Sequence, residues 1–145
     1  MTLIVDAAPL VALANTDDPQ SGAVLRALQS EPGTLILPAP VTAEVDYFLA
    51  TRLGTEAARG FMADLANEVY RVECLLPDDY RAAERLNLQY ADLRLGLADL
   101  SVIVLASRFD TLRILTFDYR HFRAVRPLQG GSFVLLPADE NAGDA

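Results

Sequence analysis

Four acidic residues lie in apolar stretches of the chain, where a carboxylate has no ordinary structural reason to be. They are Asp6, Glu44, Asp99 and Asp118, and each is flanked by aliphatic or aromatic residues. Burying an unpaired carboxylate is costly, and an isolated one tends to become protonated instead. One such residue could be an accident of packing. Four of them, at least two at predicted strand ends, indicate acids gathered around a divalent cation.

The chemistry of such a cluster favours a hard metal ion. Like charges a few ångströms apart repel strongly in a partly dehydrated site, and Mg²⁺ or Mn²⁺ removes this conflict by binding carboxylate oxygens. A metal held in this way lowers the pKa of a bound water and stabilises charge on a phosphoryl group. The chain has a single histidine, His121, and a single cysteine, Cys74, which excludes a zinc site of the His/Cys type.

The elements that must position these acids alternate along the chain. Short apolar runs rich in β-branched residues predict strands at 2–6, 34–37, 69–75, 112–117 and 132–136. Capping and turn signals predict a helical turn at 10–14 and helices at 17–30, 40–53, 55–66, 80–94 and 98–109. Strands that alternate with helices at this spacing predict a mostly parallel sheet covered on both faces.

This arrangement allows the four acids to converge. Asp6 ends the first predicted strand and Asp118 directly follows the fourth, so both lie at the carboxyl edge of the sheet, where such folds place their functional crevice. Glu44 and Asp99 each share a helical face with apolar residues three or four positions away. We therefore expect both of these side chains to point toward the sheet.

Each acid also has a simpler interpretation. Asp6 could cap the next helical turn, and Asp99 could be a first-turn acid after Gly96. Asp118 could begin an Asx-turn, and Glu44 could pair with an arginine. The metal cluster is favoured because all four acids occur together.

Composition sets the remaining limits. The 145 residues are 52% apolar, enough for one domain and one core, which we place at residues 1–137, followed by an acidic, flexible tail at 138–145. No apolar run approaches the ~20 residues of a membrane span, and the start lacks a signal peptide, so we expect a cytoplasmic protein. The net charge of −8 argues against a simple electrostatic nucleic-acid binder. There is no lysine, and five arginines fall between Arg108 and Arg126.

The order and context of the acids resemble the PIN domain, in particular the VapC-type toxin ribonucleases of bacterial toxin–antitoxin pairs. The matching segments are 4–13, 41–45, 95–102 and 115–122, and the resemblance spans residues 2 to about 136. One departure is Ala8, because members often carry Ser or Thr two positions after the first Asp. Asp92 falls where relatives often carry an acid, but we interpret it as a surface acid or one that contacts a metal ligand and not the metal.

The resemblance implies a three-layer α/β/α fold with a central, mostly parallel sheet of about five strands. It implies an endoribonuclease that depends on Mg²⁺ or Mn²⁺, a VapB-like antitoxin and a homodimer. Asp6, Glu44, Asp99 and Asp118 would form the catalytic and metal-binding site. By the same matching, Thr116 falls at a position that often bears a hydroxyl near the metal waters, and we assign it to substrate binding. Arg120, Arg123 and Arg126 closely follow the fourth acid, and they either hold the RNA backbone or form a solvated surface cluster.

Several alternatives remain open at this point. Family members cut transfer RNA or ribosomal RNA, and nothing in the sequence chooses between them. A PIN-like module that binds RNA or protein without cutting is one rival, and four intact acids disfavour it. A structure-specific DNA nuclease is another, although the chain has no added DNA-binding segment.

Overall fold

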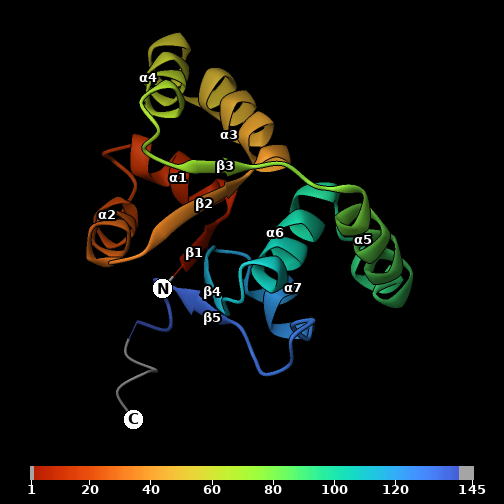
Figure 1. The fold of residues 1–145 in the computed structure, drawn as a ribbon. Coiled ribbons are helices and arrows are strands. Elements are labelled where there is room, and N and C mark those ends of the chain that lie inside the picture. The colour runs from red at the N-terminus through yellow and green to blue at the C-terminus, as the bar shows by residue number, and fades with distance from the viewer. Residues whose placement is uncertain (1, 141–145) are drawn as a thin grey trace.

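Strands and helices alternate along residues 2–140, which are the residues described by the structure, a computed structural model (Figure 1). The strands are β1 (Thr2–Val5), β2 (Thr34–Pro38), β3 (Arg71–Glu73), β4 (Arg113–Leu115) and β5 (Val134–Leu136). The helices are α1 (Ala7–Ala14), α2 (Ser21–Ser30), α3 (Ala39–Arg52), α4 (Thr55–Ala66), α5 (Pro77–Gln89), α6 (Leu97–Arg108) and α7 (Tyr119–Ala124), with the short 3₁₀ helix η1 (Ala91–Leu93) after α5.

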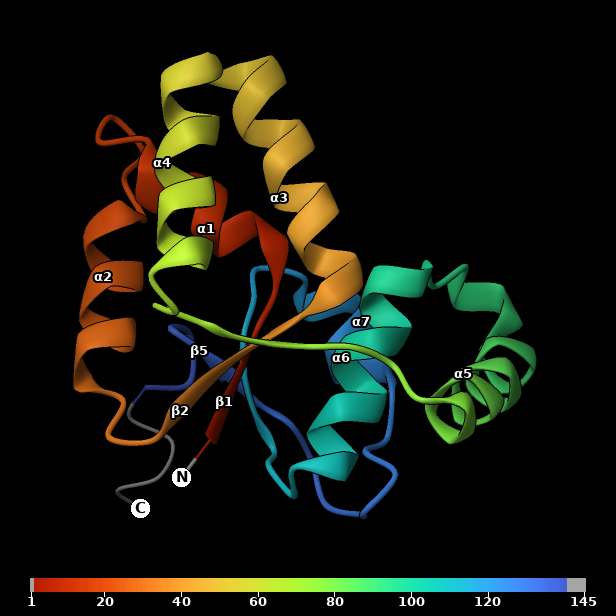
Figure 2. The same ribbon diagram turned by 45° about the horizontal axis from the view of Figure 1, so that its top comes forward.

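The five strands form one sheet in the order β3-β2-β1-β4-β5, and every neighbouring pair is parallel. Helices α1 to α4 lie on one face of this sheet and α5 to α7 on the other (Figures 1 and 2). Parallel strands need crossover connections, and helices covering both faces supply them here. The predicted three-layer α/β/α architecture is confirmed.

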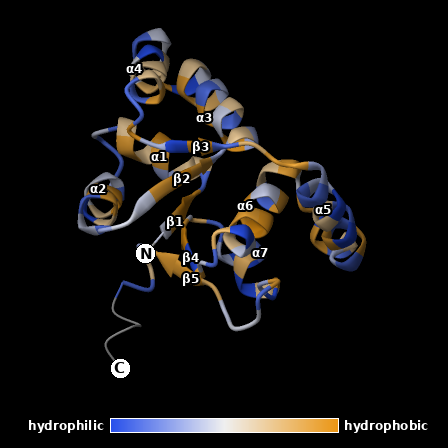
Figure 3. Ribbon diagram, in the orientation of Figure 1, coloured by the Kyte–Doolittle hydropathy of each residue, from blue (hydrophilic) through white to orange (hydrophobic). Residues whose placement is uncertain are grey.

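The sheet is the centre of the hydrophobic core. Leu3, Ile4 and Val5 of the central strand β1 are completely buried, as are Ile114 and Leu115 of its neighbour β4. The edge strand β3 is mostly hydrophilic, whereas β1 and β5 are hydrophobic (Figure 3). Charged edges of this kind discourage pairing with another chain. No helix within residues 2–140 has the length and apolar character that a membrane crossing requires.

The connectivity creates a switch point at the centre of the sheet. From β1 the chain moves outward to β2 and β3 on one side, and it later returns to β4 and β5 on the other side of β1. Crossovers in the two directions lie on opposite faces, so the loops that leave β1 and β4 diverge at their carboxyl ends. A crevice opens where they diverge, and this is where ligands bind in open α/β sheets.

Two predicted helices differ from the observed ones. The helix expected from Asp17 begins only at Ser21, because the side chains of Asn15 and Asp18 accept the N–H groups of Asp17 and Gln20 and hold this segment in turns. The long helix expected at 80–94 ends at Gln89 and is followed by η1.

Two further elements were predicted at the wrong length or missed. The turn expected at 10–14 is the full helix α1, which begins directly after Asp6. Helix α7 was not expected, because its six residues are too few for a periodic apolar pattern. Its N-cap is Asp118, whose carboxylate accepts the His121 N–H at 3.1 Å.

The expected tail is only partly covered by the structure. Residues 137–140 form a turn in which Asp139 accepts a hydrogen bond from Leu135 N–H at 2.8 Å. Asp139 also forms an ion pair with Arg123 at 2.6 Å. The rest of the expected tail, 141–145, lies outside the described residues.

An arginine on α6 joins the two ends of the connection between β3 and α5. Arg108 donates to Glu73 at 2.9 Å, to the Cys74 carbonyl at 3.1 Å and to Asp79. Asp79 is buried and also accepts the Leu76 N–H at the start of α5. Arg108 therefore neutralises two poorly solvated carboxylates and fixes α6 beside α5.

Replacing Arg108 by alanine is expected to destabilise the fold by about 2–4 kcal/mol, because buried Asp79 would lose its charged partner and Glu73 would keep only Arg71. The measurement is urea unfolding followed by circular dichroism. Arg81→Ala is the matched control, since Arg81 forms an exposed pair with Asp78 and should cost about 0.5 kcal/mol or less. Equal losses in the two variants would contradict this account.

Candidate active site

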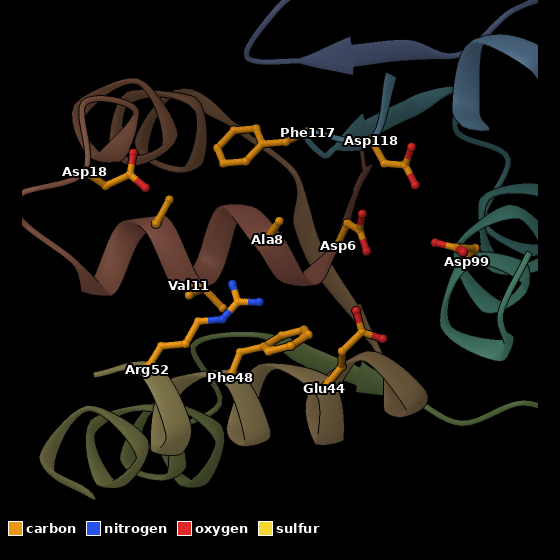
Figure 4. A pocket seen from close by; sticks show the side chains of 11 residues that line it. Asp6, Ala8, Val11, Asp18, Glu44, Phe48, Arg52, Asp99, Phe117 and Asp118 are labelled. Atoms are coloured by element: carbon orange, nitrogen blue, oxygen red, sulfur yellow. The ribbon is translucent and has the colours of Figure 1, made fainter. Parts of the chain in front are cut away.

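The four acids predicted from the sequence line one cavity of about 390 Å³ at the carboxyl edge of the sheet (Figure 4). They come from four places in the chain: the end of β1, the second turn of α3, the first turn of α6 and the loop after β4. The cavity is lined by Asp6, Ala8, Val11, Ala12, Asp18, Glu44, Phe48, Arg52, Asp99, Phe117 and Asp118. The expected convergence is therefore observed.

Asp6 is the most deeply placed of these acids, with only 7% of its surface exposed. One carboxylate oxygen accepts the Ala7 N–H at 2.9 Å and the other accepts the Thr116 hydroxyl at 2.7 Å. Burial raises the pKa of Asp6 to about 6, although both hydrogen bonds oppose this shift. The charges of Asp99 and Glu44 raise it further.

Thr116 connects two of the acids. Its hydroxyl donates to Asp6 and accepts the Asp118 N–H at 3.0 Å. The residue is completely buried, so its side chain has no surface with which to contact a substrate. Its position is instead that of a group that orients the Asp6 carboxylate and the backbone that carries Asp118.

Asp99 and Glu44 face each other's charge across the cavity. Asp99 accepts the Gly96 N–H at 3.2 Å in the first turn of α6. Burial raises the pKa of Asp99, and the nearby charge of Asp118 adds to this shift, while Gly96 and His121 oppose it. Burial also raises the pKa of Glu44, and the charge of Asp99 raises it further. Within residues 2–140 Glu44 has no ion pair with an arginine.

Asp118 is held by a histidine that the sequence did not suggest as part of the site. One of its oxygens accepts the His121 N–H, and the other lies 2.7 Å from His121 Nδ1. Ligand atoms of Asp99, Asp118 and His121 all lie within 4.8 Å of one another, a grouping that could hold a metal ion. The three-residue spacing between Asp118 and His121 was the available signal, but it is informative only once α7 is known.

The simpler interpretations of three acids hold together with the cluster. Asp6 caps α1, Asp99 is a first-turn acid of α6, and Asp118 caps α7. Each cap fixes the direction of its carboxylate and satisfies only part of its hydrogen-bonding capacity. Capping therefore orients these acids toward the cavity and does not compete with convergence.

The other residues singled out from the sequence lie elsewhere or have a different setting. Arg120 and Arg123 are exposed on α7 and do not line the cavity, and Arg123 is paired with Asp139. Ala8 lines the cavity, so no hydroxyl is present at that position. Asp92 is exposed on η1, outside the cavity.

The donor set fits a hard divalent cation. The four acids supply several carboxylate oxygens. Burial raises the pKa of three of these acids, namely Asp6, Glu44 and Asp99. That shift means that ionising these carboxylates costs more in the folded protein than in water. A cation that prefers oxygen ligands, such as Mg²⁺ or Mn²⁺, would lower this cost.

Comparison with known proteins assigns the family. The sequence model of the PIN domain matches residues 3–127. Ribonuclease VapC26 of Mycobacterium tuberculosis is 36% identical over 135 residues, which are 93% of this chain and 100% of that protein. This chain belongs to the VapC-type PIN-domain family. The resemblance inferred from the sequence is thus confirmed.

Two solved structures share the VapC-type fold. VapC20 of Mycobacterium tuberculosis, described as a Sarcin-Ricin loop cleaving toxin, superposes with a TM-score of 0.74 at 22% identity, covering 81% of this chain and 90% of that one. VapBC2 of Rickettsia felis, bound to a DNA fragment from their promoter, gives a TM-score of 0.66 at 14% identity, with 93% and 97% covered. At these identities the similarity shows the fold.

The raised pKa of Asp6 makes the metal-free protein less stable as pH rises. Its ordinary value is 3.8 and its folded value is about 6, so between these values the native state holds more protons than the unfolded state. Stability from Asp6 is therefore present below pH 4 and lost by about pH 6. In EDTA, the free energy of unfolding of Asp6→Asn should rise relative to that of wild type by up to about 3 kcal/mol as the pH increases across this window.

Urea unfolding of the two proteins between pH 4 and 7.5 checks this expectation. Mn²⁺ should reverse the order, because a cation in this cavity would bind Asp6 in its ionised form, and its affinity for wild type should rise about tenfold per pH unit below pH 6. A difference between variant and wild type that does not change with pH would contradict the assignment.

Proposed function

We propose that this protein is a metal-dependent endoribonuclease toxin that hydrolyses phosphodiester bonds in a structured RNA, either transfer RNA or ribosomal RNA. The observation that carries the proposal is the convergence of Asp6, Glu44, Asp99 and Asp118 on one cavity. Family membership and the similarity to Ribonuclease VapC26 support the reaction class. A VapB-like antitoxin is supported by the similarity to VapBC2, and we also expect a homodimer.

In the proposed site, Asp6, Glu44 and Asp99 hold Mg²⁺, with Mn²⁺ as a substitute. The bound ion would act as a Lewis acid toward the scissile phosphate and lower the pKa of a water. Asp118 binds a second, weaker ion or orients a water. Thr116 and the Ala7 N–H fix the Asp6 carboxylate, so this ligand needs no reorganisation when substrate arrives.

Asp118 is also placed to handle a proton. About a third of its side chain is exposed, so water can reach it, and the contact with His121 Nδ1 at 2.7 Å fixes its orientation. A carboxylate held in this way can accept a proton from the attacking water. Asp99, closer to the helix start, keeps one oxygen without a protein hydrogen bond for the cation.

Cleavage assays on RNA and DNA panels test this function. Wild type should cut RNA with Mg²⁺ or Mn²⁺ and not with EDTA. Glu44→Gln and Asp99→Asn should each lower the cleavage rate by more than about 100-fold, because loss of even an outer-shell partner of a metal costs 10–100-fold. Asp92→Asn is the matched control and should cut normally, since Asp92 lies outside the cavity.

Three results would reject the proposal. Cleavage of RNA that persists in EDTA would show that the reaction does not depend on a metal. Cleavage of DNA alone would favour the structure-specific DNA nuclease. Binding of RNA without any cutting would favour the non-catalytic module.

We also propose that Arg120 and Arg123 contact the RNA backbone beside the site. Both are exposed on α7, which starts directly after Asp118. Because Arg123 must first leave Asp139, Arg120→Ala should weaken RNA binding more than Arg123→Ala. Each lost phosphate contact should reduce the slope of log affinity against log salt by about 0.7 in filter-binding measurements. An unchanged slope in the double variant would reject this role.

A further inference from the structure

Helix α3 directs one stripe of side chains into the cavity. Glu44, Phe48 and Arg52 are spaced four residues apart, so they lie on the same face of the helix, and all three line the cavity. The backbone positions of Glu44 and Arg52 are about 12 Å apart along the helix axis, at 1.5 Å per residue, and the Arg52 side chain turns back so that its guanidinium lies over Phe48, one turn from Glu44. A group bound at Arg52 is therefore beyond the reacting phosphate that the acids would hold.

Arg52 is not used by the fold. Within residues 2–140 the arginines in ion pairs with carboxylates are Arg59, Arg71, Arg81, Arg108, Arg113 and Arg123. Arg52 is not one of them. Its guanidinium lies 4.2 Å from the centre of the Phe48 ring and is directed into the cavity in Figure 4. The ring contact holds the planar group in place and leaves its N–H donors free.

Charge gives Arg52 a special place in this cavity. The lining contains five carboxylates and a single guanidinium. Four of the carboxylates gather at one end, and Asp18 lies on the same side of the cavity as Arg52 (Figure 4). A guanidinium forms paired hydrogen bonds with phosphate oxygens, which is the chemistry that this end of the cavity offers.

The section between the acids and Arg52 is apolar. Phe48 and Phe117 stand on opposite sides of it, with Ala8 between them (Figure 4). Both phenyl groups are partly exposed. Exposed aromatic faces beside a positive group are the elements with which proteins bind single-stranded nucleotides, because every base can stack.

We propose that this end of the cavity is a subsite for the nucleotide next to the cleaved bond. Arg52 binds the phosphate that flanks the scissile one, and Phe48 and Phe117 provide stacking surfaces for the intervening base. The inference rests on the proposed function, because it assigns a subsite to the same reaction. It makes Arg52 a substrate-binding residue of a different kind from the exposed arginines of α7.

The test uses a short synthetic RNA hairpin that carries the cleavage site mapped on wild type. Phosphates on either side of that site are replaced one at a time by uncharged methylphosphonates. At one flanking position the replacement should lower kcat/KM of wild type by about 10- to 100-fold, the effect of losing one charged hydrogen-bonded contact. Arg52→Gln should show that loss on the unmodified RNA and no further loss at that position.

Two controls separate this role from a structural one. Arg59→Ala on α4 removes another exposed arginine, outside the cavity, and should respond to every methylphosphonate as wild type does. Arg52→Gln should keep the Tm and the Mn²⁺ affinity of wild type. In wild type, removing the base between the scissile and the flanking phosphate should lower kcat/KM. In Phe48→Leu, removing that base should leave kcat/KM unchanged.

The outcomes are distinguishable. If wild type cuts RNA and Arg52→Gln responds to every methylphosphonate as wild type does, the subsite is rejected and the proposed function stands. If Arg52→Gln loses activity equally at all positions together with Mn²⁺ affinity, Arg52 supports the metal site and the subsite is also rejected. If wild type cuts no RNA, the proposed function fails and the subsite fails with it.

Discussion

The burial of several carboxylates in one cavity, to which their mutual repulsion adds, is the constraint on which the rest of this structure depends. Asp6 is almost fully buried, and the charges of Glu44 and Asp99 add to the effect of burial on its pKa. In a less rigid fold, these carboxylates would move apart or become solvated. Here the completely buried residues of β1 and β4 fix the backbone of Asp6, and the Thr116 hydroxyl fixes its carboxylate. The protein holds the acids in place, and in the proposed function a divalent cation would make their charges tolerable.

The topology explains how acids distant in sequence reach one place. Asp6 stands at the point where the sheet switches direction, next to β4, whose end carries Asp118. Helix α6 leads into β4, so its first turn lies at the same edge of the sheet and brings Asp99 there. Helix α3 follows β2 and presents Glu44 from the other face of the sheet. The acids thus come from both helical layers and from the sheet between them.

Helix α3 also gives the cavity a direction. Its cavity-facing stripe changes from a carboxylate at Glu44 through an aromatic ring at Phe48 to a guanidinium at Arg52. The end with four acids suits a cation, and the other end offers the guanidinium of Arg52 together with Asp18, with an apolar section between them. A nucleic-acid strand has the same sequence of features, since charged phosphates alternate with flat bases. The cavity is therefore polarised along the path that an RNA strand would take.

The sequence by itself determined the elements and the unusual acids. Runs of β-branched residues set the strands, and a carboxylate in an apolar run is conspicuous because burial of charge is costly. Only the tertiary structure decided which other side chains join the site. His121 depends on a helix too short to show periodicity, and Arg52 resembles any exposed helical arginine until α3 is placed beside Phe117. Local patterns specify which side chains must be buried, whereas convergence depends on contacts between segments far apart in the chain.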